Sequence, residues 1–323
     1  MIKKIGIKLL ALIALLQFPS ALHAENPDTV TTGIYITSIH NIDFKQKEYA
    51  INFWLWMKYR NPKFDFTKNL EIPQAKTFTA SYTTVDTLKD GRIYLLMKLE
   101  CLMKDAWKID KFPFDHQTLR LSMENSQFDS RSLVFAPDTV GEHYGQWVIS
   151  GWNINKDSFI TVARNQVYKT AFGDESAEKP VSTYSAFKIR IGIDRVEPWL
   201  LFTKLFLGMY IAFLIAYVSF FIHSGSMEER FGLNVGALFA AVGNKYIIDS
   251  SLPDTTAPAL VDILHGITLL AIFAITACTI YSLKLFKEGK QEKARRIDKR
   301  MSWVVLAVYL ILNIFFVMQA LRA

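Results

Sequence analysis

The stretch RFGLNVGALFAAVGNKYIIDSSLP, residues 230–253, decides how the rest of the chain is interpreted. Only 18 residues, 231–248, separate its arginine from its first aspartate, which is near the lower limit for a membrane-spanning helix. Small residues recur along it at Gly232, Gly236, Ala240 and Gly243. Together with the polar Asn234, Asn244 and Lys245, they are typical of a helix that packs against other helices or lines water.

Apolar residues are clustered along the 323-residue chain rather than spread evenly. Residues 25–196 have the composition of a soluble β-rich domain, whereas residues 197–323 contain four long apolar runs. We expect these runs to span a membrane at about residues 199–222, 231–248, 260–285 and 303–321. The net charge of +7 comes mostly from the basic segment 284–300 between two runs, so it indicates membrane topology rather than nucleic-acid binding.

No enzyme signature stands out in the sequence. Cys101 and Cys278 lie in different parts of the chain and are not expected to pair. There is no CxxC or HExxH metal motif, no phosphate-binding glycine loop and no GxSxG nucleophile motif. We therefore expect neither catalysis nor a bound cofactor or metal.

Residues 1–24, MIKKIGIKLLALIALLQFPSALHA, have the features of a secretory signal. A lysine-rich start is followed by the apolar core 9–16 and by a small-residue exit that ends at Ala24. Cleavage after Ala24 would send the remaining chain across a membrane. A retained anchor is the alternative.

Short alternating stretches predict β-strands between residues 30 and 195. The strand-like segments are 33–37, 51–57, 93–99, 119–123, 132–135, 147–149 and 189–195. Turn signals such as Asn61-Pro62 and Asp90-Gly91 separate them. Many short strands without a helical period between them predict an antiparallel β-sandwich over residues 25–196.

The basic segment 286–300 is expected to be a cytoplasmic loop, because Lys and Arg are enriched on the cytoplasmic side of membranes. Four spans then place the β-domain and the C-terminus on the opposite side. The signal segment independently gives the same orientation, with the β-domain in the periplasm of a bacterial inner membrane.

The run KFPFDHQ, residues 111–117, stands late in the β-domain and ahead of the four apolar runs. This arrangement resembles the pentameric ligand-gated ion channels, also called Cys-loop receptors. Three further stretches are similar to parts of the family's bacterial members. VTTGIYI at 30–36 resembles their first strand, and Gly151-Trp152 and residues 159–161 resemble their eighth and ninth strands. Asn234-Val235 and Leu252-Pro253 resemble the start and the end of their second membrane segment. The resemblance covers nearly all of the mature chain. It implies a homopentamer whose partners are membrane lipids, permeant inorganic ions and a small-molecule agonist, with no nucleic acid.

The chain departs from the family in four places, one of which is that the first membrane run lacks an internal proline. The positions of the family's cysteine pair hold Asp105 and Leu119, as is common in bacterial members, so packing of Trp107, Phe112 and Phe114 is expected to hold this loop. The family's Trp-x-Pro-Asp/Glu signature is not recognisable. The second membrane segment is about one helical turn shorter than in bacterial channels.

The resemblance implies a pore lined by the second membrane segment. Gly236, Ala240, Gly243 and Ile247 fall within roughly 60° of one another on a helix and would form a narrow pore, constricted near Ile247. In the alternative, the small residues pack against a neighbouring helix and the face with Lys245 meets water. Lys245 distinguishes the two, because it must either face water or pair with an acid such as Asp249 or Asp262.

Charges near the ends of this segment bear on ion selectivity. Glu228 and Glu229 lie at its cytoplasmic end, where a ring of carboxylates favours cations, and Arg230 would offset part of their field. Five Lys245 side chains in a pore would favour anions instead. We expect cation selectivity; in the alternative, the mouth charges only mark the membrane boundary.

The resemblance implies a ligand site capped by the hairpin 167–183. The candidate residues are Tyr168, Phe172 and Tyr184, with Glu124 and Phe128 on the segment after the FPFD motif. Aromatic rings can hold cationic amines by cation–π attraction. Core packing or solvent exposure is the alternative for each ring.

A second group of residues is expected to couple the two domains. Its members are Phe112, Pro113, Phe114 and Asp115 of the motif, Arg195 at the end of the last strand, and Pro253. An Asp115–Arg195 pair would be a strut between ligand binding and gating, or else a static salt bridge. Protons are a candidate stimulus, because acidic groups and His116 near the junction can titrate.

The function that we favour is a homopentameric ligand-gated ion channel of a bacterial inner membrane. The alternative is a non-conducting receptor-like sensor with the same fold that signals to a partner through the basic loop. The short second segment and the missing signature motivate it. An auxiliary subunit of another transporter is a third, weaker reading.

Overall fold

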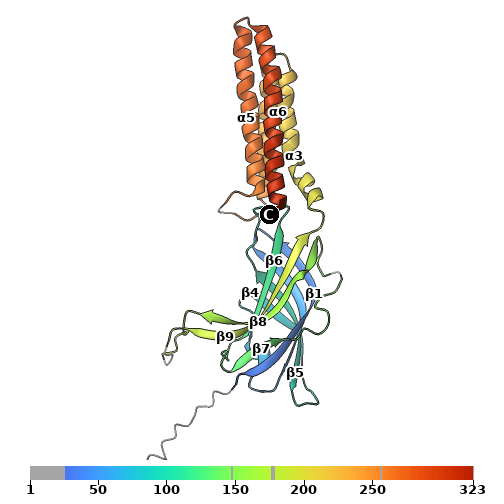
Figure 1. The fold of residues 1–323 in the computed structure, drawn as a ribbon, viewed down its shortest axis with the longest axis vertical. Coiled ribbons are helices and arrows are strands. Elements are labelled where there is room, and N and C mark those ends of the chain that lie inside the picture. The colour runs from blue at the N-terminus through green and yellow to red at the C-terminus, as the bar shows by residue number, and fades with distance from the viewer. Residues whose placement is uncertain (1–25, 147, 176–178, 255–256, 323) are drawn as a thin grey trace, which may run out of the picture.

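The computed structural model describes residues 26–146, 148–175, 179–254 and 257–322, which form a β-domain followed by a helical bundle (Figure 1). The predicted architecture is therefore confirmed. The signal segment 1–24 lies outside the described residues, and so does Trp147 of the strand predicted at 147–149. Ile149 forms only an isolated bridge with Ile39.

Two sheets make up the β-domain. One has the strand order β4-β5-β2-β1-β7 and the other β3-β6-β9-β8. The strands are β1 (Asp28–Asp43), β2 (Glu48–Tyr59), β3 (Leu70–Glu71), β4 (Ala75–Thr87), β5 (Ile93–Lys104), β6 (His116–Asn125), β7 (Leu133–Pro137), β8 (Trp152–Tyr168) and β9 (Ser182–Arg195). Paired strands run antiparallel, as predicted, except that β1 and β7 are parallel.

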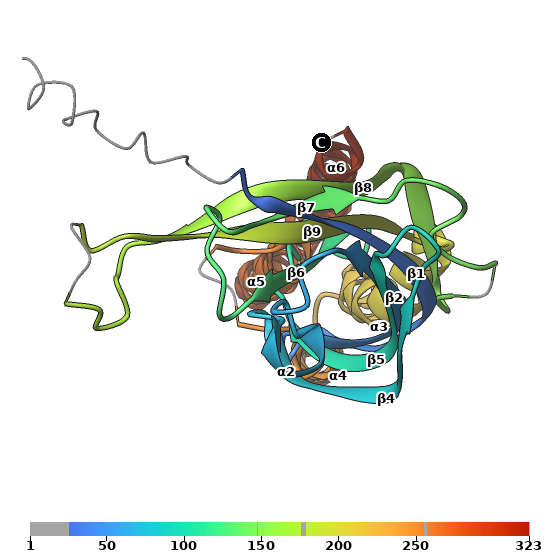
Figure 2. The ribbon, with the colours of Figure 1, turned by 90° about the horizontal axis from the view of Figure 1, so that it is seen from below.

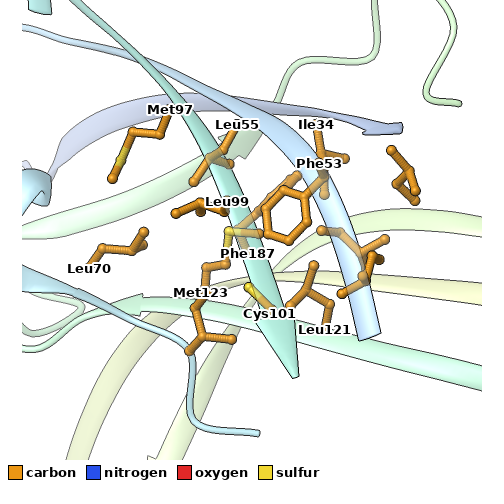
Figure 3. Packing of buried hydrophobic residues seen from close by; sticks show 14 of the residues in the cluster. Ile34, Phe53, Leu55, Leu70, Met97, Leu99, Cys101, Leu121, Met123 and Phe187 are labelled. Atoms are coloured by element: carbon orange, nitrogen blue, oxygen red, sulfur yellow. The ribbon is translucent and has the colours of Figure 1, made fainter. Parts of the chain in front are cut away.

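The sandwich core follows from a period of two in the strands. Every second residue of β2, from Tyr49 to Tyr59, is buried, so one face of this strand points inward. Side chains from both sheets interdigitate there, including Phe53 and Leu99 from one sheet and Met123 and Phe187 from the other (Figure 3). This packing makes the sandwich a rigid support for the loops at its ends.

Two strands differ from the sequence-based expectation. β4 escaped prediction because its side chains are exposed on both faces of an edge strand, so it shows no apolar alternation. The two strands expected at Gly151-Trp152 and at residues 159–161 are one strand, β8, which begins at Trp152 directly after Gly151. The register of β8 against β9 shifts between Asn155 and Ile160. The β8–β9 hairpin projects sideways from the body of the domain (Figures 1 and 2).

Four helices among the described residues are long and apolar enough to cross a membrane. They are α3 (Pro198–Val218, continued by a 3-10 turn at Ser219–Phe221), α4 (Met227–Asp249), α5 (Leu260–Lys287) and α6 (Gln291–Arg322); a short helix, α2 (Phe66–Asn69), lies in the β-domain. At 23 residues, α4 is about 35 Å long and exceeds the roughly 30 Å of membrane hydrocarbon. It begins four residues before the expected start, in a polar turn that carries two glutamates.

The expectation of a loop over residues 286–300 is wrong for most of that segment. Helix α6 begins at Gln291, so only a short turn that includes Gly289 separates it from α5. Lys, Arg, Glu and Ala are good helix formers, and the segment contains no proline to stop the helix. The helical bundle stands on one end of the sandwich, and the C-terminal end of α6 lies at that junction (Figure 1).

Candidate functional site

One face of α4 is buried within the chain. Arg230, Asn234, Ala237, Ala241 and Ile248 recur at helical spacing and are all at most 3% exposed. Ala237 and Ala241 pack in the same cluster as Phe213 of α3 and Ile272 of α5. The inward face of the helix is therefore the one that carries Asn234 and the alanines.

The opposite face of α4 is open. Gly236, Ala240, Gly243 and Ile247, the predicted pore residues, are all exposed, Ile247 to 67%. A Cβ atom added at Gly232, Gly236 or Gly243 would meet no other part of the described chain within 4 Å. The small residues thus do not pack against another described helix of the same chain.

Two large side chains on the open side escaped the sequence analysis. Phe239 is 71% exposed and Tyr246 is 76% exposed, and both lie within about 80° of Gly236 on the helix. In the sequence these two rings stand among other apolar residues, and an exposed aromatic side chain on a membrane helix is recognised only once the inward face is known. Any passage along α4 is bordered by these rings as well as by the glycines.

Lys245 forms two ion pairs. Its Nζ lies 2.7 Å from Asp249 Oδ2 and 2.7 Å from Asp262 Oδ1 at the start of α5. Of the two arrangements considered for this lysine, the structure contains the paired one. Because Lys245 is roughly 180° from Gly236 on the helix, its charge is directed away from the open face.

A buried histidine beside Lys245 was not predicted. His265 of α5 forms two hydrogen bonds. Its Nε2 lies 3.0 Å from Asn244 Oδ1, and its Nδ1 lies 2.8 Å from the carbonyl oxygen of Val261. Asn244 also donates through Nδ2 to the carbonyl of Leu205 on α3 at 3.1 Å. These bonds hold the outer half of α4 against both α3 and α5.

At the end of α4 that lies away from the β-domain, the acidic side chains and the arginine point in different directions. Glu228 and Glu229 are exposed, while Arg230 is 1% exposed and lies with Nη2 2.7 Å from Asp298 Oδ2 on α6. The guanidinium also donates to the carbonyl of Ile222. The expectation that Arg230 offsets the field of the glutamates is therefore wrong, because Asp298 neutralises it inside the bundle.

The predicted pair at the domain junction is present. Arg195 donates from Nε to Asp115 Oδ1 at 2.7 Å and from Nη2 to Oδ2 at 3.3 Å, and both side chains are largely buried. The guanidinium carbon also lies 4.2 Å from the ring centroid of Trp152, 4.8 Å from Phe112 and 4.9 Å from Phe44. Cation–π attraction therefore reinforces the ion pair.

The loop that carries the FPFD motif is closed without a disulfide. Gln117 donates to the carbonyl of Lys108 at 2.7 Å and accepts from its N–H at 3.1 Å, while the Asp105 carboxylate accepts from the N–H of Arg120 at 3.1 Å. The expected aromatic packing is also present, since the Trp107 ring lies 5.0 Å from that of Phe44. Burial raises the pKa of Asp105, because the charged carboxylate is less well solvated at this position than in water.

The same loop contacts the helices. Phe114 packs against Trp199 and Phe202 of α3, with centroid distances of 4.8 and 5.5 Å. The N–H of Leu260, the first residue of α5, donates to the carbonyl of Asp110 at 2.8 Å. Phe112, Pro113 and Pro253 are buried at this junction, where Pro253 and Ile109 line a common cavity of about 250 Å³.

Four of the five predicted ligand residues come together near the point where β8 ends and β9 begins. The Tyr168 hydroxyl donates to Glu124 Oε2 at 2.9 Å, and its ring lies 5.6 Å from Phe172 and 6.0 Å from Tyr184. Phe128 does not join them, because it packs edge-on against Phe64 of the core at 4.8 Å. The position of Phe128, three residues after the end of β6, could not reveal the direction of its side chain.

The pKa values in this cluster are shifted by burial. Glu124 is 3% exposed, and burial raises the pKa of its carboxyl group, an effect partly opposed by the hydrogen bond from Tyr168. Burial and the neighbouring Glu124 likewise raise the pKa of the Tyr168 phenol. A carboxyl group with a raised pKa next to three aromatic rings is suited to hold a cation or to take up a proton.

No protein-family model matches the chain. In sequence it is 21% identical over 316 residues to a proton-gated ion channel of Gloeobacter violaceus, an alignment that covers 90% of this chain and 83% of that channel. The resemblance to the pentameric ligand-gated ion channels is confirmed. Because the alignment covers 90% of the chain, it includes both the β-domain and the membrane helices.

The comparison also bears on two coarser predictions. The chain is a multi-pass membrane protein with a large domain outside the membrane, as the four apolar helices and the similarity to a channel both indicate. The prediction that the chain is not an enzyme is confirmed, because the relative described above is an ion channel.

Proposed function

We propose that five copies of the chain form a ligand-gated ion channel of a bacterial inner membrane, with a central pore lined by α4. The observation that carries this proposal is the division of α4 into an inward face and an open face with small residues. The open face supports the pore register of Gly236, Ala240, Gly243 and Ile247. Lipid would surround the outer helices, and the C-terminus would lie on the periplasmic side with the β-domain.

The periplasmic domain would receive the stimulus at Glu124, Tyr168, Phe172 and Tyr184. The raised pKa of Glu124 supports protons as a stimulus, and so does the similarity to a proton-gated ion channel. The aromatic rings around this carboxyl support a small cationic amine as the other class of agonist. The signal would reach α3 and α5 through the Asp115–Arg195 pair and the FPFD loop.

Cation selectivity is supported by the mouth of α4. Glu228 and Glu229 are exposed there, and the charge of Arg230 is withdrawn to Asp298. Lys245, the cation that would favour anions, is paired with two carboxylates on the inward side. A ring of ten uncompensated carboxylates around a five-fold axis would attract cations.

The pore register can be tested with two adjacent alanines. In the purified full chain, reconstituted in liposomes, Ala240→Cys and Ala241→Cys are treated with a charged thiol reagent while ion flux is measured after a step to acidic pH or addition of a small amine. We expect the reagent to block flux through the Ala240→Cys protein and to leave the Ala241→Cys protein unaffected. The parent protein with Cys101 and Cys278 replaced by Ser is the background control.

Three outcomes oppose the proposal. Block at Ala241 but not at Ala240 would reverse the pore register. An oligomeric mass other than five copies would exclude the pentamer. Absence of flux from a well-folded pentamer under all stimuli would favour the non-conducting sensor.

A further inference from the structure

Two arginines face each other across strands β6 and β9. Arg120 of β6 and Arg190 of β9 are directly opposite in the antiparallel register. Both are exposed, and they lie on the face of the sheet that points away from the sandwich core, because the neighbouring Leu119, Leu121 and Ile189 are buried. Like charges directly opposite each other destabilise the pairing of two strands. An anion between the two side chains would remove this repulsion.

The pairing geometry brings the two side chains close together. The backbone N–H of Arg120 donates to Asp105 Oδ2 at 3.1 Å, and its carbonyl accepts from the Tyr49 hydroxyl at 2.9 Å. Both backbone groups therefore point away from β9, so Arg120 and Arg190 form a non-hydrogen-bonded pair. In such a pair the Cα atoms are about 4.5 Å apart and the side chains are closer than in a hydrogen-bonded pair. Both guanidinium groups can thus reach one small ligand.

Neither guanidinium has a direct partner in the part of the chain that the structure describes. The ion pairs, side-chain hydrogen bonds and cation–π contacts described for this domain include none for them. Asp105 attracts the charge of Arg120 only across space, without an ion pair. Other acids of this face are engaged, since Asp194 lies 2.6 Å from His116 Nδ1 and Glu124 is hydrogen-bonded within the ligand cluster. The two positive charges are therefore available to an anion.

Hydroxyl groups flank the arginine pair along the strands. Ser122, the next outward residue of β6, is 4% exposed, and its Oγ has no hydrogen-bond partner among the described residues. In the other direction, the register shift of β8 between Asn155 and Ile160 brings Ser158 over Gly192. A Cβ atom at Gly192 would lie 2.4 Å from Ser158 Cβ, so a larger residue would displace this segment. Both hydroxyl groups are placed to donate to an anion beside the arginines.

A phosphate or carboxylate group matches this arrangement. A guanidinium donates two parallel hydrogen bonds to such an oxyanion, and its planar fork fits the spacing of the oxygens. Two guanidinium groups on adjacent strands can hold one oxyanion between them. Binding would also remove the repulsion between the facing charges, so it would stabilise the pairing of β6 with β9.

We propose that Arg120 and Arg190 form a binding site for a small soluble oxyanion, a phosphate or a carboxylate, which holds β6 to β9. The site lies five residues after Asp115 along the chain and five residues before Arg195. An occupied site would therefore fix the two strands between Glu124 of the ligand cluster and the Asp115–Arg195 pair. The site is separate from the ligand residues of the proposed function, and its existence does not depend on ion conduction.

Binding is tested by thermal unfolding of the purified full chain in a neutral detergent without anionic lipid, so that the added anion is the only source of phosphate or carboxylate. Sodium phosphate, sodium succinate and sodium chloride are compared at equal ionic strength. Phosphate stabilises many folded proteins by exclusion from their surface, so the relevant quantity is the excess over the variant Arg120→Gln/Arg190→Gln. We expect phosphate and succinate, but not chloride, to give the parent such an excess. The half-saturating concentration should be at least about fivefold higher in the double variant.

Single and conservative variants separate charge from geometry. Without phosphate, Arg120→Gln should unfold at a higher temperature than the parent, because it removes one of two facing charges. With saturating phosphate, this order should reverse. Arg120→Lys/Arg190→Lys keeps both charges but loses the two-pronged hydrogen bonds, so it should bind more weakly than the parent and more tightly than the double glutamine variant. Arg164→Gln changes an exposed arginine of the same face, opposite Ala186, and should behave like the parent.

Several results would overturn the site. Equal stabilisation of the parent and the double glutamine variant by phosphate and succinate would exclude Arg120 and Arg190 as the binding residues. An equal effect of chloride would indicate screening of the two charges rather than recognition of an oxyanion. A lower unfolding temperature of Arg120→Gln without phosphate would contradict the repulsion between the two side chains. A structure of the assembled oligomer with a carboxylate of a neighbouring copy between the guanidinium groups would assign the site to that copy.

Discussion

Arg195, the last residue of β9, donates hydrogen bonds to both carboxylate oxygens of Asp115. Its guanidinium also lies against the rings of Phe44, Phe112 and Trp152. The pair joins the strand that leads into α3 to the loop that touches α3 and α5. A planar guanidinium is required for this arrangement, because it forms two hydrogen bonds in its plane and stacks on rings through its faces. The pair is thus a structural connection between the proposed ligand site and the helices.

Asp115→Ala should uncouple the two domains. Removal of one partner of a buried ion pair typically costs about 3–5 kcal/mol, because the other charge is left without compensation. We expect the variant to reach the membrane in reduced amount and to lose its flux response. Surface labelling and flux in the same preparation measure both effects. A normal response to an activating stimulus would mean that the pair is a static salt bridge.

Arg195→Lys separates charge from shape at the same site. Lysine keeps the positive charge but loses the two-pronged hydrogen bond and the stacking on three rings. We expect a folded protein whose response requires a stronger stimulus, by about tenfold or more, corresponding to roughly 1.4 kcal/mol of coupling. If Arg195→Lys responds like the parent, charge alone is sufficient.

Gln117→Leu should loosen the loop that lacks a disulfide. The substitution removes the two part-buried bonds to the backbone of Lys108 and the buried hydrogen bond that Gln117 Nε2 donates to Asp115 Oδ2. We expect the free energy of unfolding to fall by about 1–3 kcal/mol, measured by thermal or denaturant unfolding. Thr118→Val on the neighbouring exposed position is the control and should change stability little. Equal stability of both variants would show that aromatic packing alone holds the loop.

Glu124→Gln should remove part of the pH dependence of the periplasmic domain. Burial raises the pKa of Glu124 above its ordinary value of 4.5, so the folded protein binds this proton more tightly than the unfolded chain. The resulting contribution to stability is present below pH 4.5 and is lost as the pH rises through the folded-state pKa. Glu124→Gln should therefore flatten the decline of stability with rising pH.

The matching control is Glu100→Gln, because Glu100 is exposed on β5. It should leave the pH profile of unfolding and the pH of half-maximal flux as in the parent. If Glu124→Gln also leaves both profiles unchanged, Glu124 is not a site at which protons act on this protein. Loss of stability at all pH values without a change in slope would indicate a packing defect instead.

Glu229→Gln and Lys245→Gln should affect the channel differently. Neutralising the exposed Glu229 is expected to lower the preference for cations over anions, which reversal potentials in asymmetric salt measure. Neutralising Lys245 should leave that preference intact but lower stability, because Asp249 and Asp262 lose their common partner. A large change of selectivity in Lys245→Gln would place this lysine in the ion path.

Much of the architecture could be predicted because it depends on local patterns. The alternation of β2 and the four apolar runs are visible in any short window of sequence. The positions of Asp115 and Arg195 followed from a family resemblance. By contrast, Arg230 and Asp298 are 68 positions apart, and no local sequence pattern indicates that they form a buried ion pair.

The remaining errors have related physical causes. Residues 291–300 were expected to form a loop because their charge dominates their composition, although charged residues are good helix formers. Phe128 was assigned to the ligand cleft by its distance from the FPFD motif, whereas the direction of a side chain beyond a strand end depends on tertiary packing. Lys245 could be limited to two alternatives from the cost of an unpaired ammonium, and only the fold distinguishes them.

The β8–β9 hairpin and α3 are connected by a stretch of chain with almost no slack. β9 is a single strand of 14 residues that begins at the hairpin and ends at Arg195, and only Val196 and Glu197 separate it from α3. Hydrogen bonds pair it along much of its length with β6 and β8, so it cannot bend or stretch easily between its two ends. A displacement of the hairpin along the axis of β9 is therefore expected to move the start of α3 as well, unless the hydrogen bonds that β9 forms with β6 and β8 break.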